Sequence, residues 1–222
     1  LFKEAKKNKK KLFIGFVTSG DPDYKSSKEI IKEMTKSCQI IEAGISFNTS
    51  TSDSPIIMEA NDRAINSGMN MNKTFKLIKE VKRETKTNTC FVIMTYLNPV
   101  KIFGIKKFIS QCNIVGIDGV IIVDSNLNSP EEKILINGLS KNKIGYIKII
   151  SPTNDDEFIK QSIKNCRDSW LYITSYFGLT GSKNVNINNV KAMIKRVRKY
   201  SKEIPVAVGF GVKTPSQVKQ VS

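Results

Sequence analysis

Histidine is absent from the 222 residues of this chain. Its absence excludes His-based catalytic triads and the commonest type of zinc site. The cysteines form no CxxC pair, and each lies in or beside an apolar segment, which favours core thiols in a reducing compartment. There are four of them: Cys38, Cys90, Cys112 and Cys166.

Long apolar runs are also missing. No run reaches the length of a membrane span, and nothing resembles a signal peptide, so no membrane association is expected and the cytoplasm is the default location. The chain opens on Leu1 rather than Met and stops at Ser222 inside a helix-like pattern. We therefore expect both ends to be trimmed.

Acidic residues are fewer than basic ones: the chain has 20 Asp and Glu but 36 Lys and Arg, which gives a formal net charge of +16. The lysines spread over nearly every predicted helix, without a nucleic-acid-binding motif and without interleaved aromatics. A solvated basic surface is the expected consequence, and nucleic-acid binding is the weakest of the functions considered. The charge would also attract anionic substrates.

Short apolar strands alternate with amphipathic helices along the whole chain, as in a parallel sheet with helical crossovers. Strands are expected at residues 12–18, 39–43, 90–94, 119–123, 146–150, 170–174 and 205–209. Helices are expected at residues 3–11, 24–36, 57–65, 74–81, 103–114, 130–139, 155–166 and 190–200, with another opening at Pro215.

This repeat favours a closed (β/α)₈ TIM barrel over an open doubly wound sheet, and residues 1–222 are expected to form one domain. No GxGxxG motif follows the first strand, which argues against a dinucleotide-binding fold. Only seven units are present, so the last strand and helix of the barrel are expected to be missing from the chain.

Two acids stand out at the second strand. Glu42 ends an apolar run, where an uncompensated carboxylate is costly to bury, and Asp53 follows on a polar loop. Carboxylates in different environments suit acid–base catalysis, because their pKa values separate. On spacing alone, a simpler interpretation is favoured, in which Glu42 pairs with a lysine and Asp53 caps the next helix.

Glycines cluster after the sixth and seventh strands, in Phe177-Gly-Leu-Thr-Gly-Ser182 and Val208-Gly-Phe-Gly-Val212. Barrels often bind a phosphate at these late loops, because glycine lets backbone N–H groups approach the anion closely. Ordinary tight turns are the alternative. Two clusters on the appropriate loops favour a phosphate site.

Five motifs together resemble the α subunit of tryptophan synthase. Phe16-Val-Thr-Ser-Gly-Asp-Pro22 is similar to the family's F-V-T-x-G-D-P, and Glu42-Ala-Gly-Ile-Ser-Phe47 is similar to E-L-G-x-P-F. The other three are Tyr96-Leu-Asn-Pro99 for Y-x-N-P, Gly178-Leu-Thr-Gly181 for G-V-T-G, and Gly209-Phe-Gly211 for G-F-G. Their spacing agrees over the whole chain.

The resemblance implies a lyase of tryptophan biosynthesis that cleaves indole-3-glycerol phosphate to indole and glyceraldehyde 3-phosphate, with no metal and no organic cofactor. It also implies an allosteric α2β2 heterotetramer in which a tryptophan synthase β subunit, the only subunit with PLP, receives the indole.

The same resemblance assigns roles to individual residues. Glu42 occupies the position of the general acid–base group, and its apolar neighbours Ile41 and Ile45 are expected to raise its pKa by desolvation. Asp53 occupies the position of the acid that accepts the indole N–H. The residues in substrate-binding positions are Tyr96 and Tyr172 at the indole, Phe16, and the phosphate-binding Gly181, Ser182, Gly209 and Gly211.

The loop between the two acids departs from the family, which usually reads P-F-S-D-P-L-A-D-G-P there. Here it reads Ser46-Phe-Asn-Thr-Ser-Thr-Ser-Asp-Ser-Pro55 and has lost two prolines and one acid, which should raise its flexibility. Two alternatives to an active lyase follow: a catalytically weakened α subunit kept mainly to bind and activate the β subunit, or a related barrel acting on another sugar phosphate.

Overall fold

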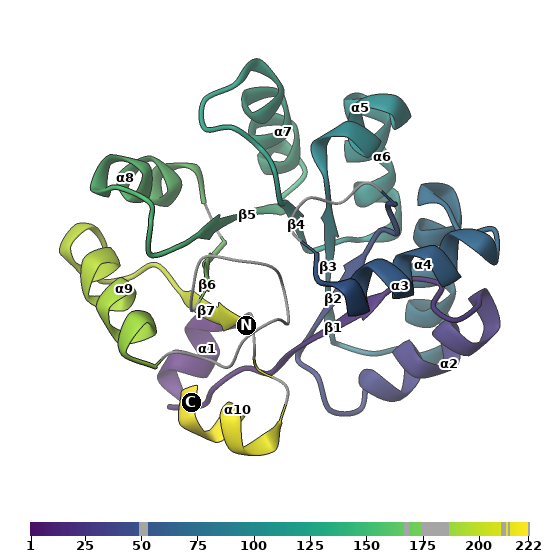
Figure 1. Ribbon diagram of the computed structural model, residues 1–222, viewed down its shortest axis with the longest axis horizontal. Helices are drawn as coiled ribbons and strands as arrows, with labels where there is room; N and C mark the ends of the chain where they lie inside the picture. Colours follow the sequence, from purple (N-terminus) through teal and green to yellow (C-terminus); the bar gives the residue numbers. More distant parts are fainter. Residues whose placement is uncertain (49–52, 167–168, 175–186, 210–211, 213, 222) are drawn as a thin grey trace.

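The computed structural model describes residues 1–48, 53–166, 169–174, 187–209, 212 and 214–221. Within them, seven parallel strands form one curled sheet in the order β1-β2-β3-β4-β5-β6-β7, so each strand pairs with its neighbours in the chain (Figure 1). The strands are β1 (Ile14–Thr18), β2 (Ile40–Gly44), β3 (Cys90–Thr95), β4 (Gly119–Ile122), β5 (Gly145–Ile150), β6 (Leu171–Thr174) and β7 (Val206–Gly209).

The helices are α1 (Phe2–Lys7), α2 (Tyr24–Met34), α3 (Pro55–Asn66), α4 (Met71–Thr85), α5 (Leu97–Phe103), α6 (Ile105–Val115), α7 (Pro130–Lys141), α8 (Asp156–Asn165), α9 (Ile187–Tyr200) and α10 (Pro215–Val221). Most of them cover the convex face of the sheet, whereas α1 packs on the inner cluster through Phe2 (Figure 1). The TIM-barrel prediction is therefore confirmed for seven strand–helix units, and no eighth strand joins β7 to β1 among the described residues.

Side-chain caps fix where several helices begin. The carboxylates of Asp23 and Asp155 accept the backbone N–H groups of Ser26 and Phe158, at 2.9 and 2.7 Å. Each cap satisfies an N–H group that has no partner within its helix, typically worth about 1 kcal/mol. The other capped starts are at Asn70 for α4 and Ser129 for α7.

Apolar side chains pack on both faces of the sheet. Between the sheet and its helices lie two clusters, one running from Ile31 to Tyr146 and the other from Ile150 to Ile204. A third cluster lies on the inner face of the barrel. It consists of Ile40, Val92, Ile121, Ile147 and Trp170, with partly buried neighbours that include Phe2, whose ring centroid lies 5.0 Å from that of Trp170.

One helix was missed by the sequence prediction, and another is shorter than predicted. Residues 97–103 form α5 because Pro99 stands in its first turn, where proline is tolerated, and Gly104 at φ +93° separates α5 from α6. The helix expected at residues 3–11 ends at Lys7. The lysines that follow repel one another and offer no apolar face.

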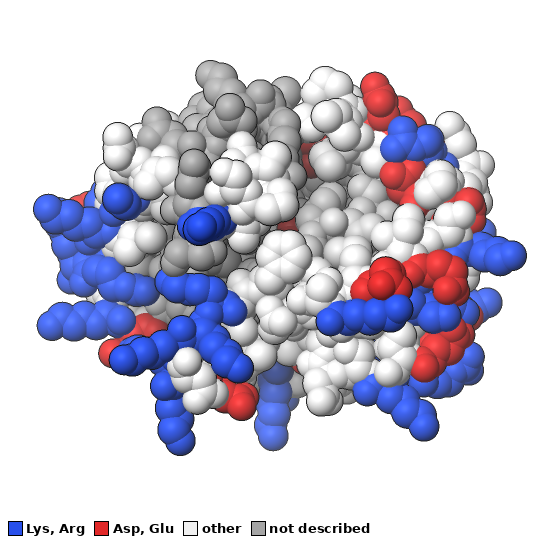
Figure 2. Space-filling model, turned by 90° about the horizontal axis from the view of Figure 1, so that it is seen from below, with Lys and Arg blue, Asp and Glu red and all other residues white. Residues whose placement is uncertain are grey.

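Basic side chains spread over the surface (Figure 2). On the side of α2 and α4 they alternate with acids: Lys28 lies 3.2 Å from Glu80 and 2.6 Å from Glu84, and Lys32 lies 3.4 Å from Glu84. On the opposite side, near α1 and α9, blue side chains predominate (Figure 2). Most of the excess positive charge on this face is thus exposed to solvent.

Among the described residues, the longest helix is α4, which has 15 residues and includes several lysines. Throughout the described ranges, no helix combines the length and apolar character that crossing a bilayer requires.

Candidate functional site

Glu42 lies at the centre of β2 and points into the barrel. It is in register with Phe16 of β1 and Val92 of β3, and only 4% of its surface is exposed. Burial raises the pKa of Glu42 from 4.5 to about 7, because the charged form loses its hydration. A carboxyl group with this pKa can both donate and accept a proton near neutral pH.

The source of this desolvation differs from the prediction. Ile41 and Ile45 were expected to raise the pKa of Glu42, but both belong to the cluster beneath the helices, on the opposite face of the sheet. Side chains alternate between the faces of a strand, so immediate neighbours in sequence cannot surround the carboxylate. The surrounding residues come from the inner face of other strands.

The simpler interpretation, a lysine partner for Glu42, does not hold within the described residues. No ion pair joins its carboxylate to a basic side chain there, and desolvation is the cause of its pKa shift. A buried acid without a basic partner is destabilising, and such groups are concentrated at functional sites.

Tyr172, at the centre of β6, also points into the barrel. Burial raises its pKa well above 10, and the negative charge of Glu42 raises it further. With this raised pKa, Tyr172 is a neutral phenol near neutral pH. Its electrostatic interaction with Glu42 shows that the two groups lie close together. Its hydroxyl end lies against Gly209, the last residue of β7.

One cavity of about 1900 Å³ brings most of the predicted site residues together. Its lining includes Glu42, Asp53, Phe16, Tyr172 and Gly209, and the cavity continues along the open side of the barrel between β1 and β7. These five residues combine two carboxylates with aromatic and apolar surface, which suits an aromatic ligand whose chemistry requires proton transfer.

Asp53 reaches this cavity from the start of α3. Its Oδ2 accepts a hydrogen bond from Nδ2 of Asn61, two turns along the helix, at 3.2 Å. The N-cap of α3 is Ser54, with Pro55 as the first helical residue, so Asp53 does not cap this helix. Asn61 was missed by the sequence analysis, although an asparagine that is 5% exposed needs a polar partner.

Tyr96 lies outside that cavity lining. It is 5% exposed and precedes α5, and its ring centroid lies 5.5 Å from that of Phe47. Phe47 belongs to the loop that leads from β2 toward Asp53, so Tyr96 supports this loop. The backbone N–H of Leu97, the next residue, donates to Oδ1 of Asp124 at 2.7 Å.

Of the four predicted phosphate-binding residues, the structure places Gly209 at the cavity. Gly181, Ser182 and Gly211 lie outside the described residues, so the phosphate site remains a prediction. The described parts of the chain contain no cluster of three acidic, cysteine or histidine side chains that could hold a metal ion.

Comparison with known proteins gives one consistent family. The family model described as "Tryptophan synthase alpha chain" matches residues 2–222. The chain is 38% identical over 220 residues to the tryptophan synthase alpha chain of Petrotoga mobilis, covering 98% of this chain and 82% of that protein.

Solved structures agree. Tryptophan synthase of Mycobacterium tuberculosis superposes with a TM-score of 0.89 at 25% identity, covering 99% of this chain and 82% of that one. The tryptophan synthase α2β2 complex of Pyrococcus furiosus gives a TM-score of 0.83 at 26% identity, with coverages of 95% and 83%.

Proposed function

Because the chain belongs to the tryptophan synthase alpha chain family, we propose that Glu42 and Asp53 carry out the lyase reaction of that family in the cavity described above. The chain is a subunit of tryptophan biosynthesis whose partner is the β subunit. Its reaction cleaves indole-3-glycerol phosphate to indole and glyceraldehyde 3-phosphate. The β subunit takes up the indole.

The observation that supports the assignment is the burial of Glu42 in a cavity that Asp53 also lines. With its pKa raised to about 7, Glu42 is substantially protonated at neutral pH and donates its proton to C3 of the indole ring. The ring becomes a cationic indolenine. Asp53 accepts a hydrogen bond from the indole N–H and stabilises the positive charge.

The second step returns the proton. Glu42, now a carboxylate, removes the hydroxyl proton from the glycerol carbon that is attached to C3. The carbon–oxygen double bond forms, the bond between that carbon and C3 breaks, and its electron pair restores the neutral indole. Glu42 ends the cycle protonated, so the reaction consumes no net proton.

Tyr172 and Phe16 provide aromatic surface for the indole, and Tyr96 acts by supporting the loop that contains Phe47. Three glycines and a serine in the late loops, Gly181, Ser182, Gly209 and Gly211, are proposed to hold the phosphate through backbone N–H groups. We also propose that residues 1–222 act as one barrel domain. A cytoplasmic location is inferred because Cys38, Cys90, Cys112 and Cys166 are all free thiols.

The decisive experiment measures indole release from indole-3-glycerol phosphate by the wild type and by Glu42→Gln, each with and without the β subunit. Glutamine keeps the shape and removes the titrating proton. Glu33→Gln, on the exposed end of α2, is the matched control and should behave as the wild type.

Indole release by the wild type that disappears in Glu42→Gln is the expected result. Stimulation of the β subunit without indole release by the wild type would overturn the proposal and favour the weakened, partner-activating subunit. Cleavage of a different sugar phosphate would favour the related barrel.

A further inference from the structure

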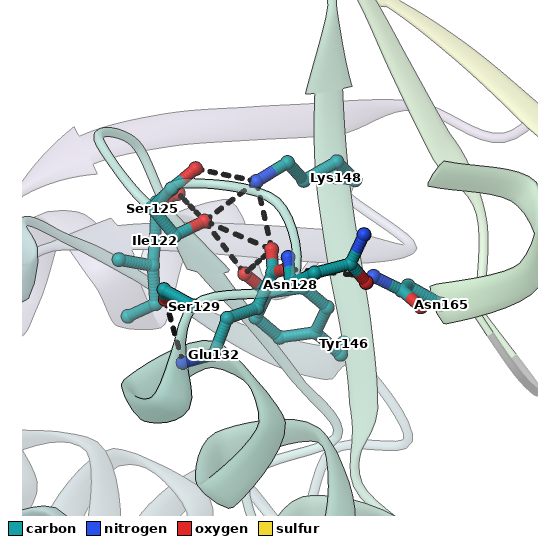
Figure 3. Close-up of polar contacts among 8 residues, drawn as sticks. All are labelled: Ile122, Ser125, Asn128, Ser129, Glu132, Tyr146, Lys148 and Asn165. Carbon is teal, nitrogen blue, oxygen red and sulfur yellow. Dashed lines mark hydrogen bonds and ion pairs between the residues drawn. The ribbon is translucent and has the colours of Figure 1, made fainter. Parts of the chain in front are cut away.

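A buried ion pair joins Lys148 of β5 to Glu132 of α7 (Figure 3). The Nζ of Lys148 lies 2.8 Å from Oε1 of Glu132, and the two side chains are 5% and 0% exposed. Burying two charges removes the hydration of each ion, and the attraction between them offsets this loss only when every remaining hydrogen-bonding group is satisfied. This pair meets that condition.

The three protons of the Lys148 ammonium group all have acceptors. Besides Glu132, it donates to the carbonyl oxygen of Ser125 at 2.6 Å and to Oγ of Ser125 at 2.7 Å. On Glu132, Oε1 also accepts the hydroxyl of Tyr146 at 2.9 Å, and Oε2 accepts the backbone N–H of Asn128 at 2.7 Å. Nδ2 of Asn165 lies 3.4 Å from the same Oε2.

These contacts converge on one loop, residues 123–129 between β4 and α7, here called the β4–α7 loop (Figure 3). Lys148 holds Ser125 at one end of the loop, and Glu132 holds Asn128 at the other. The pair lies beneath the loop, on the face of β5 that is turned toward the helices. It does not line the cavity that contains Glu42.

The β4–α7 loop leads back to the candidate active site through Asp124. Asp124 precedes the anchored Ser125, and its Oδ1 accepts the N–H of Leu97 at the start of α5. Tyr96, the residue before Leu97, packs on Phe47 of the loop that leads toward Asp53. A series of contacts therefore connects the ion pair to Phe47, on the loop that leads toward Asp53.

We propose that Lys148 and Glu132 are positioning residues for the lyase, which fix the β4–α7 loop and, through Asp124, hold Tyr96 and Phe47 in place for indole-3-glycerol phosphate. The inference rests on the proposed function of the Glu42 cavity. Lys148 and Glu132 would act on the lyase reaction without contacting the substrate or the reacting atoms. Misplacement of a binding site by about 1 Å can lower a rate by about a hundredfold, so such support has measurable consequences.

The test compares Lys148→Met, Asp124→Ala and their double variant in the complex with the β subunit. For Lys148→Met we expect kcat/KM to fall about tenfold, mainly through KM, because the loop shifts while Glu42 is untouched. Asp124 is exposed, so Asp124→Ala should give a similar change with the melting temperature nearly unchanged. The double variant should be little worse than either single one, because both act through the same contacts.

A second comparison separates positioning from stability. Adding Glu132→Gln to Lys148→Met removes the unpaired buried carboxylate and should recover the melting temperature, whereas KM stays high because Ser125 still lacks its anchor. Leu139→Ala, at the other end of α7, is the control: it lowers the melting temperature and leaves KM unchanged. Recovery of KM together with stability, or a KM unaffected by Asp124→Ala, would overturn the proposal.

Binding of the unreactive phosphate ester of 3-(indol-3-yl)propanol, measured by titration, keeps the two proposals distinguishable. If the wild type releases no indole, the proposed function fails. The positioning role is still supported if the variants bind this ester about tenfold more weakly than the wild type, and it is overturned if they bind it equally well.

Discussion

The phenol oxygen of Tyr172 occupies the space in front of Gly209, where a Cβ atom would lie only 1.9 Å away from it. The ring carbons Cζ and Cε1 would be 2.4 and 2.8 Å from the same Cβ. Removing the hydroxyl alone would not make room. Glycine at this position is therefore a condition for placing the tyrosine ring beside Glu42.

The first prediction follows from this contact. Gly209→Ala should displace Tyr172 and lower kcat/KM about tenfold, since overpacking of this kind costs about 1–3 kcal/mol. When Tyr172→Ala is already present, adding Gly209→Ala should lower kcat/KM little further. The four proteins form a double-mutant cycle measured by indole release, and additive losses would contradict the contact.

The stability of the protein should depend on pH through Glu42. The folded state raises its pKa from 4.5 to about 7, so between these values the unfolded chain has released a proton that the folded chain still holds. Rising pH therefore favours unfolding across this window, by about 3 kcal/mol in total, and has no further effect above it. Below pH 4.5 Glu42 is protonated in both the folded and the unfolded chain, so its ionisation does not reduce the stability.

Glu42→Gln removes this titration. Urea unfolding of wild type and variant between pH 4 and 8 should show the variant gaining stability relative to the wild type as pH rises toward 7. Parallel curves would show that the carboxylate is not desolvated in the folded protein.

The activity should fall above neutral pH. The reaction begins with proton donation by Glu42, so kcat/KM should fall about tenfold for each pH unit above about 7. Glu33→Gln should give the same profile as the wild type. A profile that stays flat to pH 9 would remove Glu42 from the role of initial proton donor.

Asp53→Asn should separate charge from geometry at the second acid. The amide oxygen can still accept from Asn61, so the position of the side chain should be kept, but the charge that stabilises the indolenine is lost. We expect kcat to fall by about 10²–10³ with a small change in KM. Loss confined to KM would instead indicate that Asp53 serves binding alone.

The strand–helix alternation and the burial of Glu42 could be predicted from the sequence, because both depend on local apolar patterns. It was misleading about what surrounds Glu42. Ile41 and Ile45 are near in sequence but lie on the other face of the sheet, and Tyr172 comes from a strand far along the chain. Residue order does not reveal which inward side chains meet across a barrel.

The ion pair of Lys148 and Glu132 was not predicted for a related reason. Lys148 lies within an apolar strand and Glu132 within the first turn of a helix, where acids are common for local electrostatic reasons. Nothing in their spacing indicates that they meet. Likewise, α5 was missed because Pro99 normally suggests a helix boundary, and only its place in the first turn permits the helix.

The two outer clusters divide the chain at one point along its length. One contains buried residues from Ile31 to Tyr146, and the other contains those from Ile150 to Ile204. A ribosome that synthesises the chain from its amino end therefore delivers the whole first cluster before the first residue of the second. Lys148 lies between the two clusters in the sequence, and its partner Glu132 is synthesised before it.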